Sequence, residues 1–297
     1  MLHSQFKLAL WSLPIAVLAA GVASAQGQQD FSAVQIKTHK VAGNVSYLEG
    51  QGGNVGLLIG DDGVLMIDDQ FAPLSEKLTA AIRALSNKPI RMLVNTHVHG
   101  DHTGGNENFG KMGVAIFSRE QLRARMAGGQ KPAPAAALPS VTYSAPVTVT
   151  LNGEAIQLIP VPLAHTDGDT MVYFPTADVI MTGDFYRSVG YPFPDPNNGG
   201  TFKGLIDGLN QVIALAKPTT KIVPGHGPIV DKTAVAAHRD MALSVRDKVA
   251  GLIKDGKSVE EVLAAKPTAD LDAKVDPGGM SNERFLRALY GNLATAK

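Results

Sequence analysis

The sequence predicts a mixed α+β protein with two sheets, helices outside them and a helical extension at the C-terminus. Three observations predict this class. Short apolar runs separated by turn sequences are typical of β-strands, and runs with helical spacing follow them. This order of strands and then helix occurs twice along the chain. From Asp231 onward the pattern is helical throughout.

The first half is expected to form one sheet with two helices. Three apolar runs are divided by the turn sequences "EGQGGN" and "GDDG", so we expect them to pair as antiparallel strands. Pro73 opens a helical pattern that continues to Leu85. The predicted strands are 45–48, 55–59, 64–67, 90–94 and 114–117, and a second helix is predicted at 118–127.

The second half repeats the order after a segment rich in Pro, Ala and Gly, residues 128–140, which is the best candidate for a linker. The predicted strands are 147–151, 156–160, 171–174, 179–181 and 221–223, with a helix at 202–216. Three helices are expected after Asp231, the last one capped by Ser281 or Asn282. We therefore expect a catalytic domain at 26–230 and a helical extension at 231–297 packed on it.

The first 25 residues have the pattern of a secretory signal peptide. Lys7 precedes a mostly apolar stretch at 8–20, and Ala23-Ser24-Ala25 is a small-x-small cleavage site. An uncleaved membrane anchor is the alternative, but the stretch is shorter than the ~20 residues of a span and Pro14 interrupts it. We expect an exported protein, periplasmic or secreted, with no membrane attachment after cleavage.

Composition excludes several classes of protein. The chain has 297 residues and no cysteine, which removes disulfides, thiolate ligands and thiol catalysis. Its 27 Lys+Arg balance 27 Asp+Glu, which argues against a nucleic-acid partner. A hydrophobic content of 44% with 18% charged residues is typical of a folded globular protein. A soluble enzyme or a binding protein remains.

The most informative segment is "LVNTHVHGDHTGGN", directly after an apolar strand. His97 and His99 are two residues apart, so in an extended chain they point to the same side and can hold one ion together. Asp101 and His102 lie past a glycine turn, so they cannot both join His97 and His99 on one tetrahedral ion. Two neighbouring ions, about 3.5–4 Å apart, are the economical solution. The alternative, ordinary polar loop residues, is disfavoured by the density of ligand types.

Three further segments offer metal ligands at the ends of apolar runs. His165 lies in "PLAHTDGDT", Asp184 in "VIMTGDFY" and His226 in "KIVPGHGPIV". Each of these residues taken alone is more often a loop cap. Together with the first motif they place five of the eight histidines where sheet-based sites carry their ligands.

In this order, "HVHGDH", "AHTDGD", "GD" and "GHG" resemble the metallo-β-lactamase superfamily of metallo-hydrolases, over roughly residues 41–230. The resemblance implies a four-layer αββα sandwich with two zinc ions at one edge of the sheets; manganese and iron are not excluded. The implied ligands are His97, His99 and His165 for the first ion, Asp101, His102 and His226 for the second, and Asp184 bridging them. Asp68, in "LMIDD", would support the site without ligating.

The resemblance also implies a chemistry, hydrolysis of a C(=O)–X bond by a metal-bound hydroxide. Zinc lowers the pKa of bound water to about 7. Asp101 is the candidate catalytic residue, which would orient the hydroxide and pass a proton to the leaving group. Dedicated β-lactamases of this superfamily lack the bridging Asp, so Asp184 favours the glyoxalase-II, lactonase and thioesterase side. Lactone, ester, thioester or β-lactam substrates all fit, and β-lactamase activity stays open.

The loop "FYRSVGYPFPDPNNGG" is the candidate wall of a substrate pocket. We expect Tyr186, Tyr191 and Phe193 to line an apolar pocket, and Arg187 or Asn197 to meet a carboxylate or carbonyl. The alternative, equally weighted, is that the aromatic side chains only pack the loop.

Three alternative functions use the same ligands or the same fold. A non-catalytic periplasmic metal-binding protein could use the same ligands without turnover. The di-iron reductases of the same fold commonly carry Glu where His99 stands and need a flavin domain. The nuclease branch needs a basic excess that this chain lacks. We expect a small-molecule substrate and no nucleic-acid partner, and the sequence leaves the oligomeric state open.

Overall fold

The structure is a computed structural model that describes residues 30–275 and 280–295. The predicted signal peptide, residues 1–25, lies outside the described residues. None of the described helices is both long enough and apolar enough to cross a membrane.

The first sheet has seven strands in the order β1-β2-β3-β4-β5-β6-β7. They are β1 (Lys37–Ala42), β2 (Val45–Glu49), β3 (Val55–Gly60), β4 (Gly63–Ile67), β5 (Ile90–Val94), β6 (Ala115–Arg119) and β7 (Val141–Tyr143). Strands β1 to β4 are antiparallel, which confirms the pairing predicted for the first three apolar runs. Strands β4 to β7 are parallel, so their carboxyl ends meet at one edge of the sheet.

The second sheet has five strands in the order β12-β11-β10-β9-β8. They are β8 (Val147–Leu151), β9 (Glu154–Val161), β10 (Asp169–Phe174), β11 (Val179–Met181) and β12 (Lys221–Val223). Only β11 and β12 are parallel. All five strands were predicted from the sequence.

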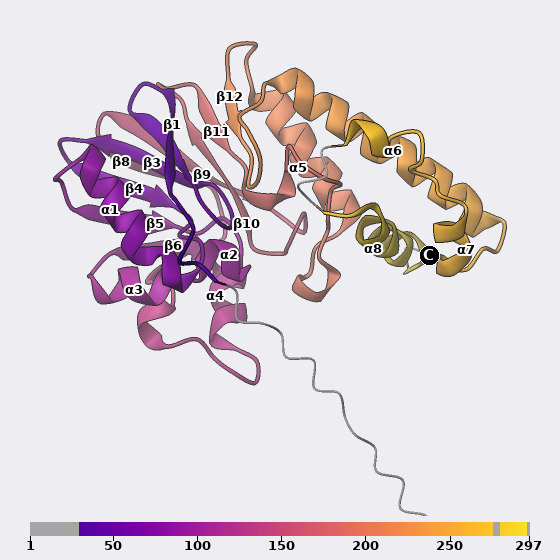
Figure 1. Ribbon diagram of the computed structural model, residues 1–297, viewed down its shortest axis with the longest axis horizontal. Helices are drawn as coiled ribbons and strands as arrows, with labels where there is room; N and C mark the ends of the chain where they lie inside the picture. Colours follow the sequence, from indigo (N-terminus) through magenta and orange to yellow (C-terminus); the bar gives the residue numbers. More distant parts are fainter. Residues whose placement is uncertain (1–29, 276–279, 296–297) are drawn as a thin grey trace, which may run out of the picture. The chain divides into compact units, whose positions relative to one another are not determined.

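Four layers result from the way the helices cover the outer faces of the two sheets (Figure 1). Buried residues of both sheets, such as Leu58 and Phe174, fill the space between them. Leu78 of α1 and Phe109 of α3 pack on the outer face of the first sheet. Leu209 of α5 and Val235 of α6 cover the second. The predicted αββα sandwich is confirmed.

The α-helices are α1 (Ser75–Leu85), α2 (Gly100–Thr103), α3 (Asn106–Lys111), α4 (Glu120–Ala127), α5 (Phe202–Leu215), α6 (Lys232–Lys254), α7 (Val259–Ala264) and α8 (Asn282–Thr295). Five 3-10 turns complete the described elements: η1 (Ala72–Leu74), η2 (Ala135–Ala137), η3 (Gly183–Phe185), η4 (Pro196–Asn198) and η5 (Asp272–Lys274).

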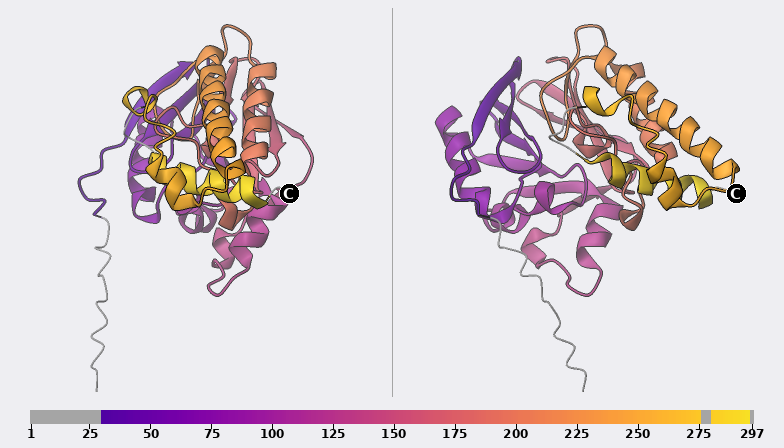
Figure 2. Two further views of the ribbon diagram at one scale, coloured as in Figure 1. Left: turned by 90° about the vertical axis from the view of Figure 1, so that its right-hand side faces the viewer. Right: turned by 45° about the vertical axis from the view of Figure 1, so that its right-hand side comes forward.

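The three helices after Asp231 form a helical layer of their own beside α5. Val249 of α6, Val262 of α7 and Phe285 of α8 share one buried cluster. In Figure 2, α8 runs crosswise to α5 and α6. The Ser281 hydroxyl accepts a hydrogen bond from the Arg284 main-chain NH, so Ser281 caps α8.

The predicted linker at 128–140 is wrong as a boundary between the two sheets. The chain continues from it into β7, which still belongs to the first sheet, so the boundary falls at residues 144–146. The segment packs closely on α3, because Asn106 donates a hydrogen bond to the Ala137 carbonyl. Strand β7 was not predicted because only one of its three residues is buried, whereas β11 and β12, which are as short, contain adjacent buried apolar residues. Strand β1 was not predicted because most of its side chains are polar and none is fully buried.

Candidate metal centre

The predicted ligands converge at one edge of the sandwich, at the ends of strands from both sheets. All of them lie at carboxyl ends of strands: His97 and His99 follow β5, His165 follows β9, Asp184 follows β11 and His226 follows β12. Main-chain hydrogen bonds fix the chain around these ligands. Thr170 N to Thr96 O (2.8 Å) and Asn54 N to Gly225 O (2.7 Å) link the two sheets, and Gly225 N to Gly183 O (2.9 Å) links the loops after β11 and β12. The fold therefore fixes the ligand loops to one another.

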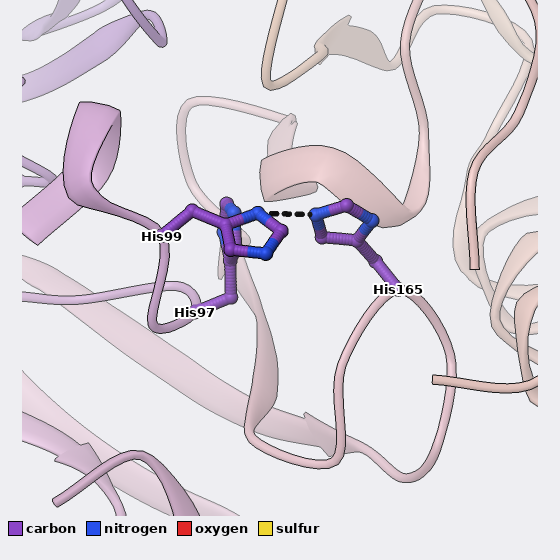
Figure 3. A group of neighbouring side chains, drawn as sticks. All are labelled: His97, His99 and His165. Atoms are coloured by element: carbon purple, nitrogen blue, oxygen red, sulfur yellow. Dashed lines mark hydrogen bonds between the residues drawn. The ribbon is translucent and has the colours of Figure 1, made fainter. Parts of the chain in front are cut away.

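The first cluster consists of His97, His99 and His165 (Figure 3). His99 Nδ1 and His165 Nε2 lie 2.9 Å apart. The His97 ring centroid is 4.9 Å from that of His99 and 4.7 Å from that of His165. Two nitrogen ligands of a tetrahedral zinc are roughly 3.3 Å apart at ordinary bond lengths. The three rings are thus placed to share one ion.

The second cluster consists of Asp101, His102 and His226. The Nε2 atom of His226 lies 3.1 Å from Asp101 Oδ2 and 3.3 Å from His102 Nε2. Asp101 and His102 come from α2, directly after the turn that follows His99. A single turn of chain therefore divides the two clusters, as the spacing of the motif predicts.

Asp184 stands between the clusters. Its Oδ1 is 3.1 Å from His102 Nε2, and its Oδ2 is 3.3 Å from His226 Nε2. The same Oδ2 is 3.9 Å from His165 Nε2 of the first cluster. The carboxylate is thus within reach of both clusters, which is the place that a bridging ligand needs.

Outer hydrogen bonds set which nitrogen of each first-cluster ring faces inward. His99 donates from Nε2 to Asp195 Oδ2 over 2.8 Å, which leaves Nδ1 for an ion. His165 donates from Nδ1 to the Phe193 carbonyl over 2.5 Å, which leaves Nε2. Both partners belong to the loop after Asp184.

Asp68 supports one histidine of each cluster. It accepts a 2.7 Å hydrogen bond from His102 Nδ1 and another from the Thr96 hydroxyl, and that hydroxyl lies 3.1 Å from His97 Nδ1. Its backbone has φ of 61°, an uncommon conformation for a residue other than glycine. A carboxylate oxygen of Asp68 and one ring nitrogen each of His97 and His102 also lie within 4.8 Å of one another, close enough to hold an ion. Because its oxygens are taken by Thr96 and His102, it is placed to support the ligands.

The protonation states of the first cluster suit a bound cation. Burial lowers the pKa of His97 well below its usual range and lowers that of His165 to about 4, so both rings are neutral at pH 7. In the part of the chain that the structure describes, the buried Nε2 of His97 has no hydrogen-bond partner. Neutral imidazole is the form that ligates metal. The residues present therefore fit a zinc-type ion.

The second cluster contains the charges that such an ion would balance. Burial raises the pKa of Asp101, but the hydrogen bond to His226 and the charges of His102 and His226 together outweigh it, and the pKa falls to about 2. For His102, burial lowers the pKa, and the carboxylates of Asp184 and Asp68 outweigh it and raise it. Protons on these imidazoles provide positive charge beside the carboxylates, and a bound metal ion would replace them.

The candidate pocket residues fall into two groups. Arg187 lies 3.4 Å from Asp184, and the Phe193 ring centroid is 6.1 Å from that of His165, so both lie beside the clusters. Tyr186 instead packs edge-on to His238 of α6, and Tyr191 stacks on α8. These contacts favour loop packing for both tyrosines.

Asn197 is exposed, and its carbonyl accepts a hydrogen bond from Arg125. The neighbouring Asn198 is the residue that approaches the centre, since it donates to Asp195 over 2.7 Å. The sequence analysis missed Asp195 and Thr96. No local pattern marks Asp195, and only the rule that a ligating histidine needs a partner on its other nitrogen could have prompted a search for it.

Comparison with known proteins identifies the family. The sequence profile of the metallo-β-lactamase superfamily matches residues 48–226, more than half of the chain. The chain therefore belongs to that superfamily, as its motifs predicted.

Two curated relatives illustrate the range of the match. A hydroxyacylglutathione hydrolase from Nitrosococcus oceani is 27% identical over 175 residues, covering 57% of this chain and 60% of the relative. The alpha subunit of a 2,4-dinitroanisole O-demethylase from a Nocardioides species is 31% identical over 145 residues, covering 44% and 42%. The chain thus spans about two fifths to three fifths of the length of these relatives.

Solved structures support the fold. A metallo-β-lactamase from Pontibacter korlensis aligns with a TM-score of 0.61 at 19% identity, over 70% of this chain and 99% of that one. A stereoselective inverting sec-alkylsulfatase from a Pseudomonas species aligns with a TM-score of 0.69 at 18% identity, over 88% of this chain and 51% of that one. Several of the matched proteins are named as hydrolases, which is the class predicted from the sequence.

Proposed function

We propose that the chain is an exported metal-dependent hydrolase with a binuclear zinc centre, acting on a C(=O)–X bond of a small molecule. The observation that carries the proposal is the pair of clusters with Asp184 between them. Two ligand sets that share a carboxylate are suited to two ions about 3.5–4 Å apart. The motifs, the family and the relatives named as hydrolases support the same chemistry.

Bound zinc would supply a nucleophile at neutral pH by lowering the pKa of a coordinated water, and would polarise the substrate carbonyl. The chain's residues supply binding, orientation and a proton path. The side chain of Asp101 is 27% exposed, whereas that of Asp184 is 4% exposed. Asp101 is therefore the carboxylate of the centre best placed to exchange a proton with a leaving group.

Arg187 is the candidate for holding a substrate carboxylate or carbonyl. Its guanidinium lies beside Asp184, and its buried Nε has no hydrogen-bond partner within the described residues. A buried donor without a partner costs free energy, which a substrate oxygen would recover on binding. Phe193 would form an apolar wall beside His165.

The substrate class is tested with a panel of a lactone, an ester, a thioester and a β-lactam, each assayed with and without a chelator. We expect hydrolysis of at least one member, loss of turnover with the chelator and recovery on adding zinc. A protein that is loaded with two ions and inactive on the whole panel would instead support the alternative, a non-catalytic metal-binding protein.

Export is tested separately, by following the full chain in a bacterial host. We expect the periplasmic or secreted fraction to contain a chain that begins at Gln26, after cleavage behind Ala25. An intact N-terminus recovered with the membrane fraction would contradict the cleavage and support the anchor.

A further inference from the structure

Helix α8 lies beyond the residues that match the superfamily and contacts the loop after Asp184 at several points. The Tyr191 main-chain NH donates to the carbonyl of Met280, just before the helix, over 3.0 Å. The Tyr191 ring stacks on Phe285 with centroids 5.6 Å apart and planes inclined by 10°. The Arg284 guanidinium lies 4.3 Å from the Phe193 ring centroid.

A further contact follows along the same helix. Asn292 accepts a hydrogen bond of 2.8 Å from the main-chain NH of Phe202, at the first residue of α5. The contacts therefore fall at Tyr191, Phe193 and Phe202, on both sides of Asp195. Tyr191 and Phe193 are 4% and 6% exposed, so this part of the loop is buried. Helix α8 therefore contacts this loop at its beginning and at its end.

The same stretch of loop provides the outer contacts of the first metal cluster. The Phe193 carbonyl fixes the ring of His165, and the Asp195 carboxylate fixes the ring of His99. The Asp195 main-chain NH also donates to the His165 carbonyl over 2.8 Å. Two of the three histidines of the first cluster are therefore oriented by Phe193, which α8 contacts, and by Asp195, two residues further along the same loop.

The second cluster depends on other parts of the fold. Asp68 holds His102, and the carbonyl of Asp101 accepts a hydrogen bond from the Gly53 main-chain NH. In the described part of the chain, the loop after Asp184 meets this cluster through Ser188, which donates to the main-chain carbonyl of His226, and through the Tyr186 carbonyl, which accepts from Gly225; both residues precede Tyr191. A shift of the loop from Tyr191 to Asn198 therefore acts on one cluster and spares the other.

We propose that α8 is a positioning element for the first metal site, acting through the loop from Tyr191 to Asn198 on the rings of His99 and His165. The inference rests on the proposed metal centre. It predicts that loosening α8 weakens the binding of one ion and leaves the other in place. Loss of the outer partner of a ligating histidine typically costs 10–100-fold in metal affinity.

The test compares two variants that weaken the same buried cluster at different places. Phe285→Leu removes the ring that stacks on Tyr191 while keeping the core filled, and Phe285→Ala is its stronger form. Val249→Ala, on α6, is the control, because Val249 is fully buried in that cluster but belongs to neither α8 nor the loop. A surface pair repeats the comparison without touching the core: Arg284→Ala, next to Phe193, against Arg287→Ala, which pairs with Glu260 and Glu283.

The readout is binding of Co²⁺ to the metal-free proteins, followed by absorption spectra and compared with His99→Ala and His226→Ala as references for each site. We expect two ions in the wild type, and about tenfold or greater weakening of the first site in the Phe285 variants, with a smaller effect in Arg284→Ala. Val249→Ala and Arg287→Ala should keep both affinities.

Unchanged affinities in the Phe285 variants, or equal weakening of both sites, would overturn the inference while leaving the metal centre intact. If Phe285→Ala does not fold, Phe285→Leu and Arg284→Ala decide the question. A wild type that binds fewer than two ions would count against the proposed function itself.

Discussion

Asp195 illustrates, at the scale of single residues, how one carboxylate can set the geometry of a metal site that it does not touch. Its Oδ2 accepts from His99 Nε2 and from Asn198, and its Oδ1 accepts from the Asn197 main-chain NH. It thereby fixes both the ring of His99 and the turn at η4. A charged acceptor opposite a ligating imidazole also makes the ligand more basic.

Asp195→Asn should weaken binding at the first site by about 10–100-fold and spare the second. The amide keeps the size of the side chain but removes the charge that orients the His99 Nε2–H. Zinc titration against a competing chelator measures the effect. Asp178→Asn is the control, because Asp178 accepts from Thr219 and Thr220 at the opposite end of β11. Equal affinity in both variants would show that Asp195 does not support His99.

Asp184 is predicted to set the substrate preference. Asp184→Ser and Asp184→Cys remove the carboxylate that reaches both clusters, and they approach the pattern that the superfamily resemblance implies for dedicated β-lactamases. We expect the ratio of lactam to ester turnover to rise by about tenfold, mainly through a fall in ester turnover. Steady-state kinetics on zinc-loaded proteins measure this ratio. An unchanged ratio refutes a role for Asp184 in specificity.

The loop between β2 and β3 lies against the second cluster. A Cβ added to Gly53 would overlap the imidazole of His102, and the Gly53 carbonyl is held by the side chain of Gln70. Gly53→Ala should therefore displace His102 and weaken the second site by about tenfold. Gly251→Ala in α6 is the control, since nothing lies within 4 Å of its added Cβ. If metal titration gives the same second-site affinity for both variants, the close approach has no role.

Helix α6 contains a histidine that makes the stability of the fold depend on pH. Burial lowers the pKa of His238 to about 4, and its ring packs on Tyr186. In the unfolded chain the same histidine has a pKa near 6.5. The contribution of neutral, buried His238 to the free energy of unfolding is therefore fully present above pH 6.5 and is lost as the pH falls toward 4. His238→Phe should remove this loss, about 1–2 kcal/mol between pH 7.5 and 5.0.

The measurement is urea unfolding of the metal-free wild type and His238→Phe at both pH values. The metal-cluster histidines titrate in both proteins, so their contribution cancels in the difference. Two proteins that lose the same free energy of unfolding on acidification would contradict the role of His238.

At the scale of the whole molecule, the metal centre should contribute to stability as well as to chemistry. Two buried clusters bring together carboxylates and imidazoles that a cation would balance. Ions at a thousand times their dissociation constant stabilise the folded state by about 4 kcal/mol per site. Removing them should lower Tm by roughly 10 °C or more for a chain of this size. Differential scanning calorimetry with chelator, and again after adding zinc, checks this; a Tm insensitive to both treatments speaks against a built-in metal centre.

The sequence predicts the sandwich and the metal ligands because both follow from local patterns. The strands of the second sheet are apolar runs between turns, and His97 to His102 lie within six residues. The outer partners are different in kind: Asp195 is 96 residues from His99, and Phe285 is 94 residues from Tyr191. No spacing rule connects residues that only the folded chain brings together. Strands β1 and β7 were not predicted because neither contains adjacent buried apolar residues, whereas β11 and β12, which are as short as β7, do.

The central claim is a centre of two ions held by seven side chains and used for hydrolysis. Its most direct test is the metal content of the purified wild type, measured beside hydrolysis of the substrate panel before and after chelation. We expect two zinc ions per chain, and turnover that is lost with the chelator and restored by zinc. A chain that binds one ion or none, or turnover that the chelator leaves unchanged, would contradict it.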